Sequence, residues 1–99
     1  MTYSLTDKLS FDENPVIEVK GKKFTVKSDA EIILQLLDIL QSYGETQATI
    51  RAFEILFSEK DQKGIKDLKL SFKDYVKFLE VAIDLALGED PDADEPGEA

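Results

Sequence analysis

The chain has 99 residues, 42% of them hydrophobic, which is enough for one domain with a single core but not for a core plus a deep substrate cleft. It contains no cysteine and no histidine, which excludes disulfides and cysteine metal sites and removes the usual general base. The net charge of -9 is uneven: six acidic residues and no basic residue lie from Gly88 onward, which leaves -3 for residues 1–87. A nearly balanced body with an acidic end argues against binding of nucleic-acid phosphates.

Residues 1–14 carry scattered apolar side chains without a clear period, and we interpret them as an N-terminal arm. The segment begins MTYSLTDKLS, which lacks the basic and then apolar pattern of a secretory signal. The chain has no stretch that approaches the roughly 20 apolar residues of a membrane span. We therefore expect a soluble, cytoplasmic protein that does not bind membranes.

Residues 15–27, PVIEVKGKKFTVK, predict a β-hairpin. With Gly21-Lys22 as a two-residue type II′ turn, four apolar side chains face one another in two pairs: Val19 with Phe24, and Ile17 with Val26. Polar side chains fall mainly on the opposite face. Because a lone hairpin is only marginally stable in water, this one must pack on something apolar.

A first helix is predicted from Asp29 to about Tyr43. Ser28, three residues before Glu31, has the spacing of a reciprocal N-terminal cap, and Gly44 suits the position just after a helix end. A second helix is expected from Glu45 or the next residue to residue 58.

Residues 59–70, EKDQKGIKDLKL, are charged and contain a glycine, so we interpret them as a linker with at most a short helical turn. Ser71, followed by Asp74, starts a third helix that runs to Leu87 and stops at Gly88. Residues 88–99 are rich in proline, glycine and acid and are expected to be disordered. The predicted class is α+β, mostly α: an N-terminal hairpin packed on three helices in one domain of residues 15–87.

The types and spacing of the charged residues do not indicate a metal site or a catalytic site. A calcium loop that starts at Asp61 would place Lys63 at the third position and Phe72 at the twelfth, where carboxylates are required. The hairpin lysines lack interleaved aromatic residues, and they are more typical of a solubilising face than of a nucleic-acid site. We expect a binding protein rather than an enzyme, with no catalytic residue, metal or cofactor.

Two stripes of apolar residues are left over once each helix has a core-facing side. On the third helix the main face is expected to hold Phe72, Tyr75, Val76, Leu79, Ile83, Ala86 and Leu87. A second stripe, off that face, contains Phe78, Val81 and Leu85, and the second helix has a smaller one with Ala48, Ala52 and Ile55. Either these stripes pack inside the monomer, or they contact another chain.

The chain resembles the small tail assembly chaperones of long-tailed bacteriophages, closest to those of phages and prophages of Gram-positive hosts. The likeness lies in the arm with DKLSFDENP, the hairpin VIEVKGKKFTV, the helix with RAFEILFSE, the string LKLSFKDYVKFLEVAIDLALGE and the acidic end. The resemblance implies a factor in the host cell cytoplasm that binds the tape measure protein and keeps it soluble until tail-tube subunits assemble around it.

From these observations we expect a homo-oligomeric chaperone of the tape measure protein. Its predicted partner-binding residues are Phe78, Val81, Leu85 and Ile55, shared between subunits or offered to a client helix. Two alternatives stay open: an acidic inhibitor of a DNA-binding protein, and a minor connector protein of the virion. The inhibitor would require carboxylates arrayed on the folded body.

Overall fold

A computed structural model describes residues 1–10 and 12–92. Its elements in chain order are a short 3-10 turn Thr6–Lys8 (η1), β1 Val16–Val19, β2 Lys22–Thr25, α1 Ala30–Ser42, α2 Glu45–Leu56, α3 Glu59–Asp67 and α4 Phe72–Ala86. The predicted class is confirmed: an N-terminal antiparallel hairpin is followed by helices that make up most of the fold. Most of the acidic end for which disorder was predicted, residues 93–99, lies outside the described residues.

The hairpin turn lies one residue earlier than predicted. Lys20 and Gly21 both have positive φ, 51° and 81°, as a type I′ turn requires, and Ile17 therefore pairs with Phe24. The predicted pairing of Val19 with Phe24 is wrong by two positions, since Val19 pairs with Lys22. The sequence indicates this turn only weakly, because Lys20 stands where a type I′ turn usually has asparagine. A shift of two preserves which face each side chain takes. The inward set is therefore as predicted, with Phe24 and Val26 buried and Ile17 and Val19 half-buried.

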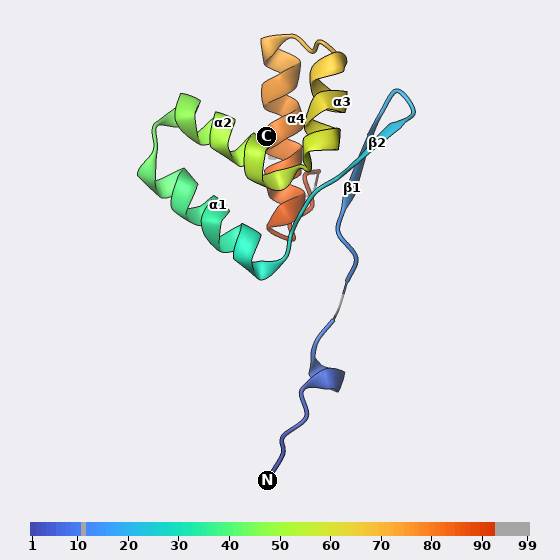
Figure 1. Ribbon diagram of the computed structural model, residues 1–99, viewed down its shortest axis with the longest axis vertical. Coiled ribbons are helices and arrows are strands. Elements are labelled where there is room, and N and C mark those ends of the chain that lie inside the picture. The colour runs from blue at the N-terminus through green and yellow to red at the C-terminus, as the bar shows by residue number, and fades with distance from the viewer. Residues whose placement is uncertain (11, 93–99) are drawn as a thin grey trace.

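The first helix lies where we predicted, at Ala30–Ser42 between the cap residues Asp29 and Tyr43, but the interactions at its two ends differ from the prediction. Asp29 is its N-cap residue, and the Ser28 hydroxyl instead donates to Oδ1 of Asn14, 2.9 Å away, which ties the helix start to the base of the arm. At the other end Gly44 has φ −68° and serves as the N-cap residue of α2, where its carbonyl accepts from the amide of Ala48 at 2.8 Å. The connection is therefore short, and α1 and α2 form an antiparallel pair (Figure 1).

The segment predicted as a linker forms a helix, α3, so residues 1–10 and 12–92 contain four α-helices rather than the three predicted. Ser58 caps it by accepting from the amide of Asp61 at 3.2 Å. The side-chain amide of Gln62 donates from Nε2 to the backbone carbonyls of Glu54 and Phe57, which satisfies acceptors at the C-terminal end of α2. Charged residues dominate α3, and only Ile65 is buried, so its apolar periodicity is too weak to reveal it in the sequence.

The predicted ends of the last helix, α4, are confirmed. The Ser71 hydroxyl accepts from the amide of Asp74 at 3.2 Å. At the C-terminal end Gly88 has φ 80°, and its amide donates to the Leu85 carbonyl, while the Glu89 amide donates to that of Asp84. These two bonds form a Schellman motif, in which glycine avoids the steric cost of a left-handed residue.

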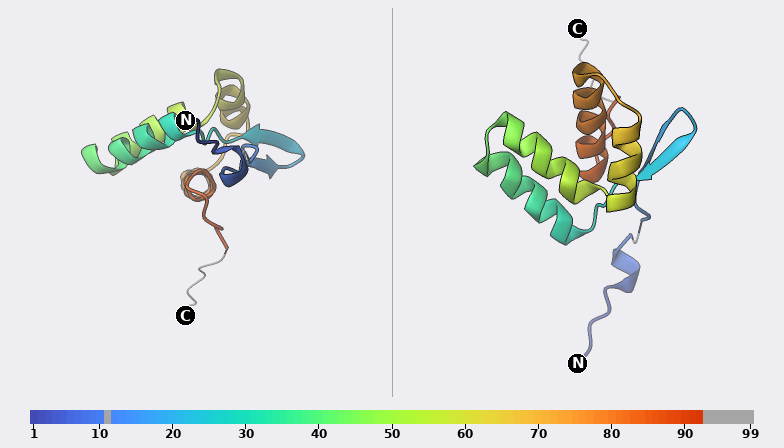
Figure 2. Two further views of the ribbon diagram at one scale, coloured as in Figure 1. Left: turned by 90° about the horizontal axis from the view of Figure 1, so that it is seen from below. Right: turned by 45° about the horizontal axis from the view of Figure 1, so that its top comes forward.

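The core joins the hairpin to α1, α2, α3 and α4, and aromatic side chains lie at its centre. The Phe78 ring of α4 contacts Phe24 of β2 edge-on, with 6.2 Å between centroids, and Phe57 at 5.6 Å. Leu36, Leu56 and Ile65 are fully buried around them. In Figures 1 and 2 the α1–α2 pair lies on one side of α4, while α3 and the hairpin lie on the other side.

Candidate partner-binding surfaces

α4 is turned about its axis relative to the prediction. Its buried residues are Phe78, Leu79, Ala82 and Ala86, a face centred between the two predicted stripes. Phe72, assigned to the core from the sequence, is 81% exposed, whereas Phe78, assigned to the outer stripe, is only 7% exposed. The assignment of Phe72 to the core face was therefore wrong, and for Phe78 the alternative of packing inside the monomer holds. The apolar arc of α4 is wider than its packed face, so apolar side chains remain uncovered along both edges.

The four residues predicted to bind a partner do not form one surface. Phe78 belongs to the core, as in the monomer alternative left open above, and its outer part lines a groove beside the hairpin. Val81 is half-buried in the same groove, and Leu85 is half-buried one turn further along α4. Ile55 lines a separate hollow between α1 and α2.

We call the first surface the hairpin groove. It has a volume of about 500 Å³ and runs between β1, the α3–α4 connection and α4. Its apolar walls come from Ile17, Val19, Leu68, Leu70, Phe78 and Val81. Lys20, Lys69 and Lys77 line its edges, with Asp74 as the acidic member, so the rim carries a net positive charge.

The second surface, the α1–α4 groove, consists of two hollows of about 290 and 340 Å³. They adjoin because Glu45, Thr49 and Val76 line both of them. Their apolar residues include Leu40, Tyr43, Ile50, Phe72, Val76, Leu79 and Ile83. The charged residues of the lining are Glu45 and Glu80, so this rim is negative where that of the hairpin groove is positive.

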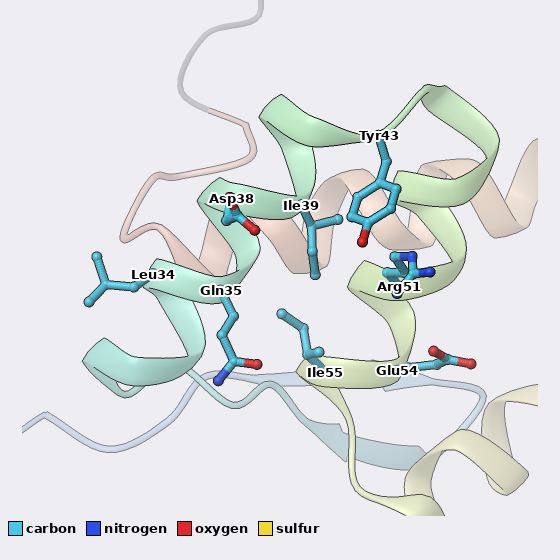
Figure 3. A pocket seen from close by; sticks show the side chains of 8 residues that line it. All are labelled: Leu34, Gln35, Asp38, Ile39, Tyr43, Arg51, Glu54 and Ile55. Carbon is cyan, nitrogen blue, oxygen red and sulfur yellow. The ribbon is translucent and has the colours of Figure 1, made fainter.

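A third hollow, of about 450 Å³, lies on the other side of the α1–α2 pair (Figure 3). In Figure 3 Ile39 and Ile55 point toward each other, and the Tyr43 ring extends toward Arg51, whose guanidinium carbon lies 4.2 Å from the ring centroid. This cation–π contact is an internal partner for the arginine. Together with Asp38 and Glu54 it makes this hollow polar, and it is a weaker candidate for an apolar partner.

Tyr75 lies in the wall of the α1–α4 groove, with its ring 5.6 Å from that of Phe53. Burial raises the pKa of its phenol above 10.0, and the negative charge of Glu54 raises this pKa further. The phenol is therefore neutral at physiological pH and offers a hydrogen bond at the groove wall.

The α1–α4 groove was missed by sequence reasoning, which treated Phe72 and Val76 as core residues. The available signal was the width of the apolar arc on α4, which exceeds what one neighbouring helix can cover. Among residues 1–10 and 12–92, no cluster of three or more acidic, cysteine or histidine side chains is placed to hold a metal ion. In the same part of the chain, no helix is both long enough and apolar enough to cross a bilayer.

Comparison of the chain with protein-family models, with curated proteins and with solved structures finds no match.

Proposed function

We propose that this protein is a tail assembly chaperone of a long-tailed bacteriophage, which binds the tape measure protein in the host cytoplasm and keeps it soluble. The proposal is supported by the resemblance of the sequence and by the character of the α1–α4 groove. A chaperone of this kind requires exposed apolar surface and no chemistry, since its work is to cover a sticky segment of another chain.

The observation that carries the proposal is the uncovered apolar lining of the α1–α4 groove. Phe72 is 81% exposed, and Leu40 and Ile50 are each more than 40% exposed, around two adjoining hollows. Contiguous exposed apolar residues with a polar rim are typical of binding sites in soluble proteins. A groove between helices suits an amphipathic helix, which inserts side chains at every third or fourth position.

Charge favours the same kind of client. Glu45 and Glu80 on the rim attract a client helix with basic residues beside its apolar stripe. The net charge of -9, most of it contributed from Gly88 onward, repels other copies of the complex and keeps it in solution.

Co-expression with fragments of the tape measure protein encoded by the same phage or prophage tests this proposal. We expect the parent protein to co-purify with helical fragments that precipitate when expressed alone. Phe72→Asp and Ile50→Asp should each reduce the captured fragment at least tenfold while the far-ultraviolet circular dichroism stays unchanged. Lys73→Ser is the matched control, because it alters the net charge as much as Phe72→Asp does, at an exposed neighbouring position.

Two results would count against the proposal. Failure of the parent protein to capture any fragment would reject the chaperone function. If Leu85→Asp abolishes capture while the two groove variants retain it, the client binds along the stripe predicted from the sequence and not in the α1–α4 groove. Phe78→Asp cannot make this distinction, because a charge in the core would unfold the domain.

A further inference from the structure

The N-terminal arm has no clear apolar period over residues 1–14 as a whole, but within residues 2–10 polar and apolar side chains alternate except at Asp7. Apolar side chains stand at the odd positions Tyr3, Leu5 and Leu9, and every even position from 2 to 10 is polar, with Asp7 as the odd-numbered exception. This is the alternation of a strand that covers an apolar surface with one face. In the structure the three apolar side chains are at least half exposed, and η1 interrupts the arm.

The base of the arm is held to the body by two hydrogen bonds. The carbonyl of Pro15 accepts from the amide of Val26 at 2.8 Å, and Asn14 is held by the Ser28 hydroxyl, so the base of the arm is bound to the chain that follows β2. Beyond this point the arm extends away from the helices (Figures 1 and 2). The ribbon of residues 1–10 therefore lies away from the helices that line the grooves of its own molecule (Figures 1 and 2).

The hairpin groove offers the kind of surface that this pattern requires. Within the described residues the sheet has two strands, so β1 pairs with β2 alone and presents its other edge. On the far side of β2, Asp61 of α3 accepts from the amide of Thr25 at 3.0 Å, so that edge is partly occupied. Ile17 and Val19 of β1 line the groove together with Phe78 and Val81. The unpaired edge of β1 therefore borders the apolar hairpin groove.

The charges of the two parts are complementary. The rim of the hairpin groove carries Lys20, Lys69 and Lys77 against Asp74. The arm carries Asp7, Asp12 and Glu13 against Lys8, and its net negative charge comes from Asp12 and Glu13, which lie between the apolar positions and the base of the arm. Electrostatic attraction therefore favours the arm as the occupant of this groove and disfavours it in the α1–α4 groove, whose rim is acidic.

We infer that the arm of one copy adds as a third strand to the β1 edge of a second copy and places Tyr3, Leu5 and Leu9 in its hairpin groove. Backbone hydrogen bonds from strand addition supply affinity, and the alternate apolar side chains supply register. Reciprocal exchange between two copies closes a two-fold dimer, in which the same pair of surfaces is used twice. The occupant is a second copy because each arm points away from its own body. This inference concerns self-association and does not depend on the proposed client.

Cross-linking provides a direct test, since the chain has no cysteine of its own. Leu5→Cys protein, carrying an affinity tag, is mixed with untagged Val81→Cys protein and oxidised under mild conditions. We expect a mixed disulfide dimer between the two variants. The control mixture of Leu5→Cys with Ile50→Cys, in the α1–α4 groove, should give at least tenfold less mixed dimer. Equal yields in the two mixtures, or none in either, would overturn the inference.

The double variant Leu5→Cys, Val81→Cys distinguishes a second copy from the molecule's own arm. Inter-chain exchange predicts covalent dimers, whereas folding back of the arm predicts an intramolecular disulfide in a monomer at all dilutions, which would also overturn the inference. As an independent measurement, sedimentation equilibrium of the full chain should show self-association at micromolar concentration. The variant Leu5→Asp, Leu9→Asp should weaken that association at least tenfold, without loss of fold, because both residues are exposed. If the parent protein sediments only as an 11.1 kDa species, the inferred exchange of arms between two copies is wrong.

Discussion

The two grooves on either side of α4 share one helix and differ in nearly everything else. The hairpin groove is walled by a strand and has lysines on its rim, while the α1–α4 groove is walled by helices and has glutamates on its rim. Phe78 forms part of the first from within the core, whereas Phe72 stands almost free at the edge of the second. One helix with an apolar arc wider than its packed face thus leaves two apolar surfaces uncovered, and the rims of these surfaces carry opposite charge.

We expect the largest change in stability to distinguish substitutions at the two phenylalanines of α4. Phe78→Ala removes a ring that packs on both Phe24 and Phe57, and we expect the free energy of unfolding to fall by about 3–5 kcal/mol. Phe72→Ala should change it by less than about 0.5 kcal/mol, because the Phe72 ring is mostly in water. Urea denaturation of the two variants measures the difference. Similar losses would mean that α4 is not rotated as described.

A smaller loss is expected where α3 supports the hairpin. A Cβ atom added to Gly64 would lie 2.9 Å from the ring of Phe24, which is buried against Phe78 and cannot easily move aside. Gly64→Ala should therefore lower the free energy of unfolding by about 1–2 kcal/mol, even though alanine favours a helix by up to about 1 kcal/mol. Lys60→Ala, at an exposed position of the same helix, is the control and should be neutral within about 0.5 kcal/mol. If Gly64→Ala stabilises the protein, α3 does not pack closely against the Phe24 ring of the hairpin.

The sequence predicts the hairpin, α1, α2 and α4 because their apolar residues repeat with the period of each element. Ser71 and Gly88 mark the ends of α4 for the same local reasons in the sequence and in the structure. α3 escapes prediction because Ile65 is the one buried residue of this helix, and its other contacts, such as Asp61 with Thr25 and Gly64 with Phe24, join segments that are distant in the chain.

The surfaces are less predictable than the elements. A helical wheel shows that α4 has more apolar residues than one face can hold, but not which edge faces the core. That choice depends on how Phe24 and Phe57 approach Phe78, which are contacts between residues far apart in the chain. The set Phe78, Val81, Leu85 and Ile55 therefore names a stripe with helical spacing, while the hairpin groove and the α1–α4 groove are formed only by the tertiary fold.

Charge reversal on the two rims should affect one groove at a time. Lys77→Glu should weaken self-association through the hairpin groove roughly two- to fivefold, and Glu80→Lys should weaken client capture through the α1–α4 groove by a similar factor, the range expected for exposed ion pairs. Each variant should leave the other activity unchanged. Sedimentation and the co-purification assay provide the two measurements, at low and at high salt. Loss of both activities in either variant would show that the grooves are not independent.

The smallest expected effect is on the pH dependence of stability. It tests the position of Tyr75 in the wall of the α1–α4 groove. Burial raises the pKa of Tyr75 in the folded state, and Glu54 raises it further, so the folded protein holds this proton more tightly than the unfolded chain. The stabilising contribution is complete below the unfolded pKa of about 10 and is lost as the pH rises through the higher folded value. Tyr75→Phe should remove this loss, so that the stability of the variant falls less steeply between about pH 9 and 11 than that of the parent. Glu54→Gln, which leaves the burial of the phenol in place and removes only the charge, should reduce the slope in part. Urea denaturation across this pH range makes the measurement, and equal slopes for the parent and Tyr75→Phe would place the phenol in water rather than in the groove wall.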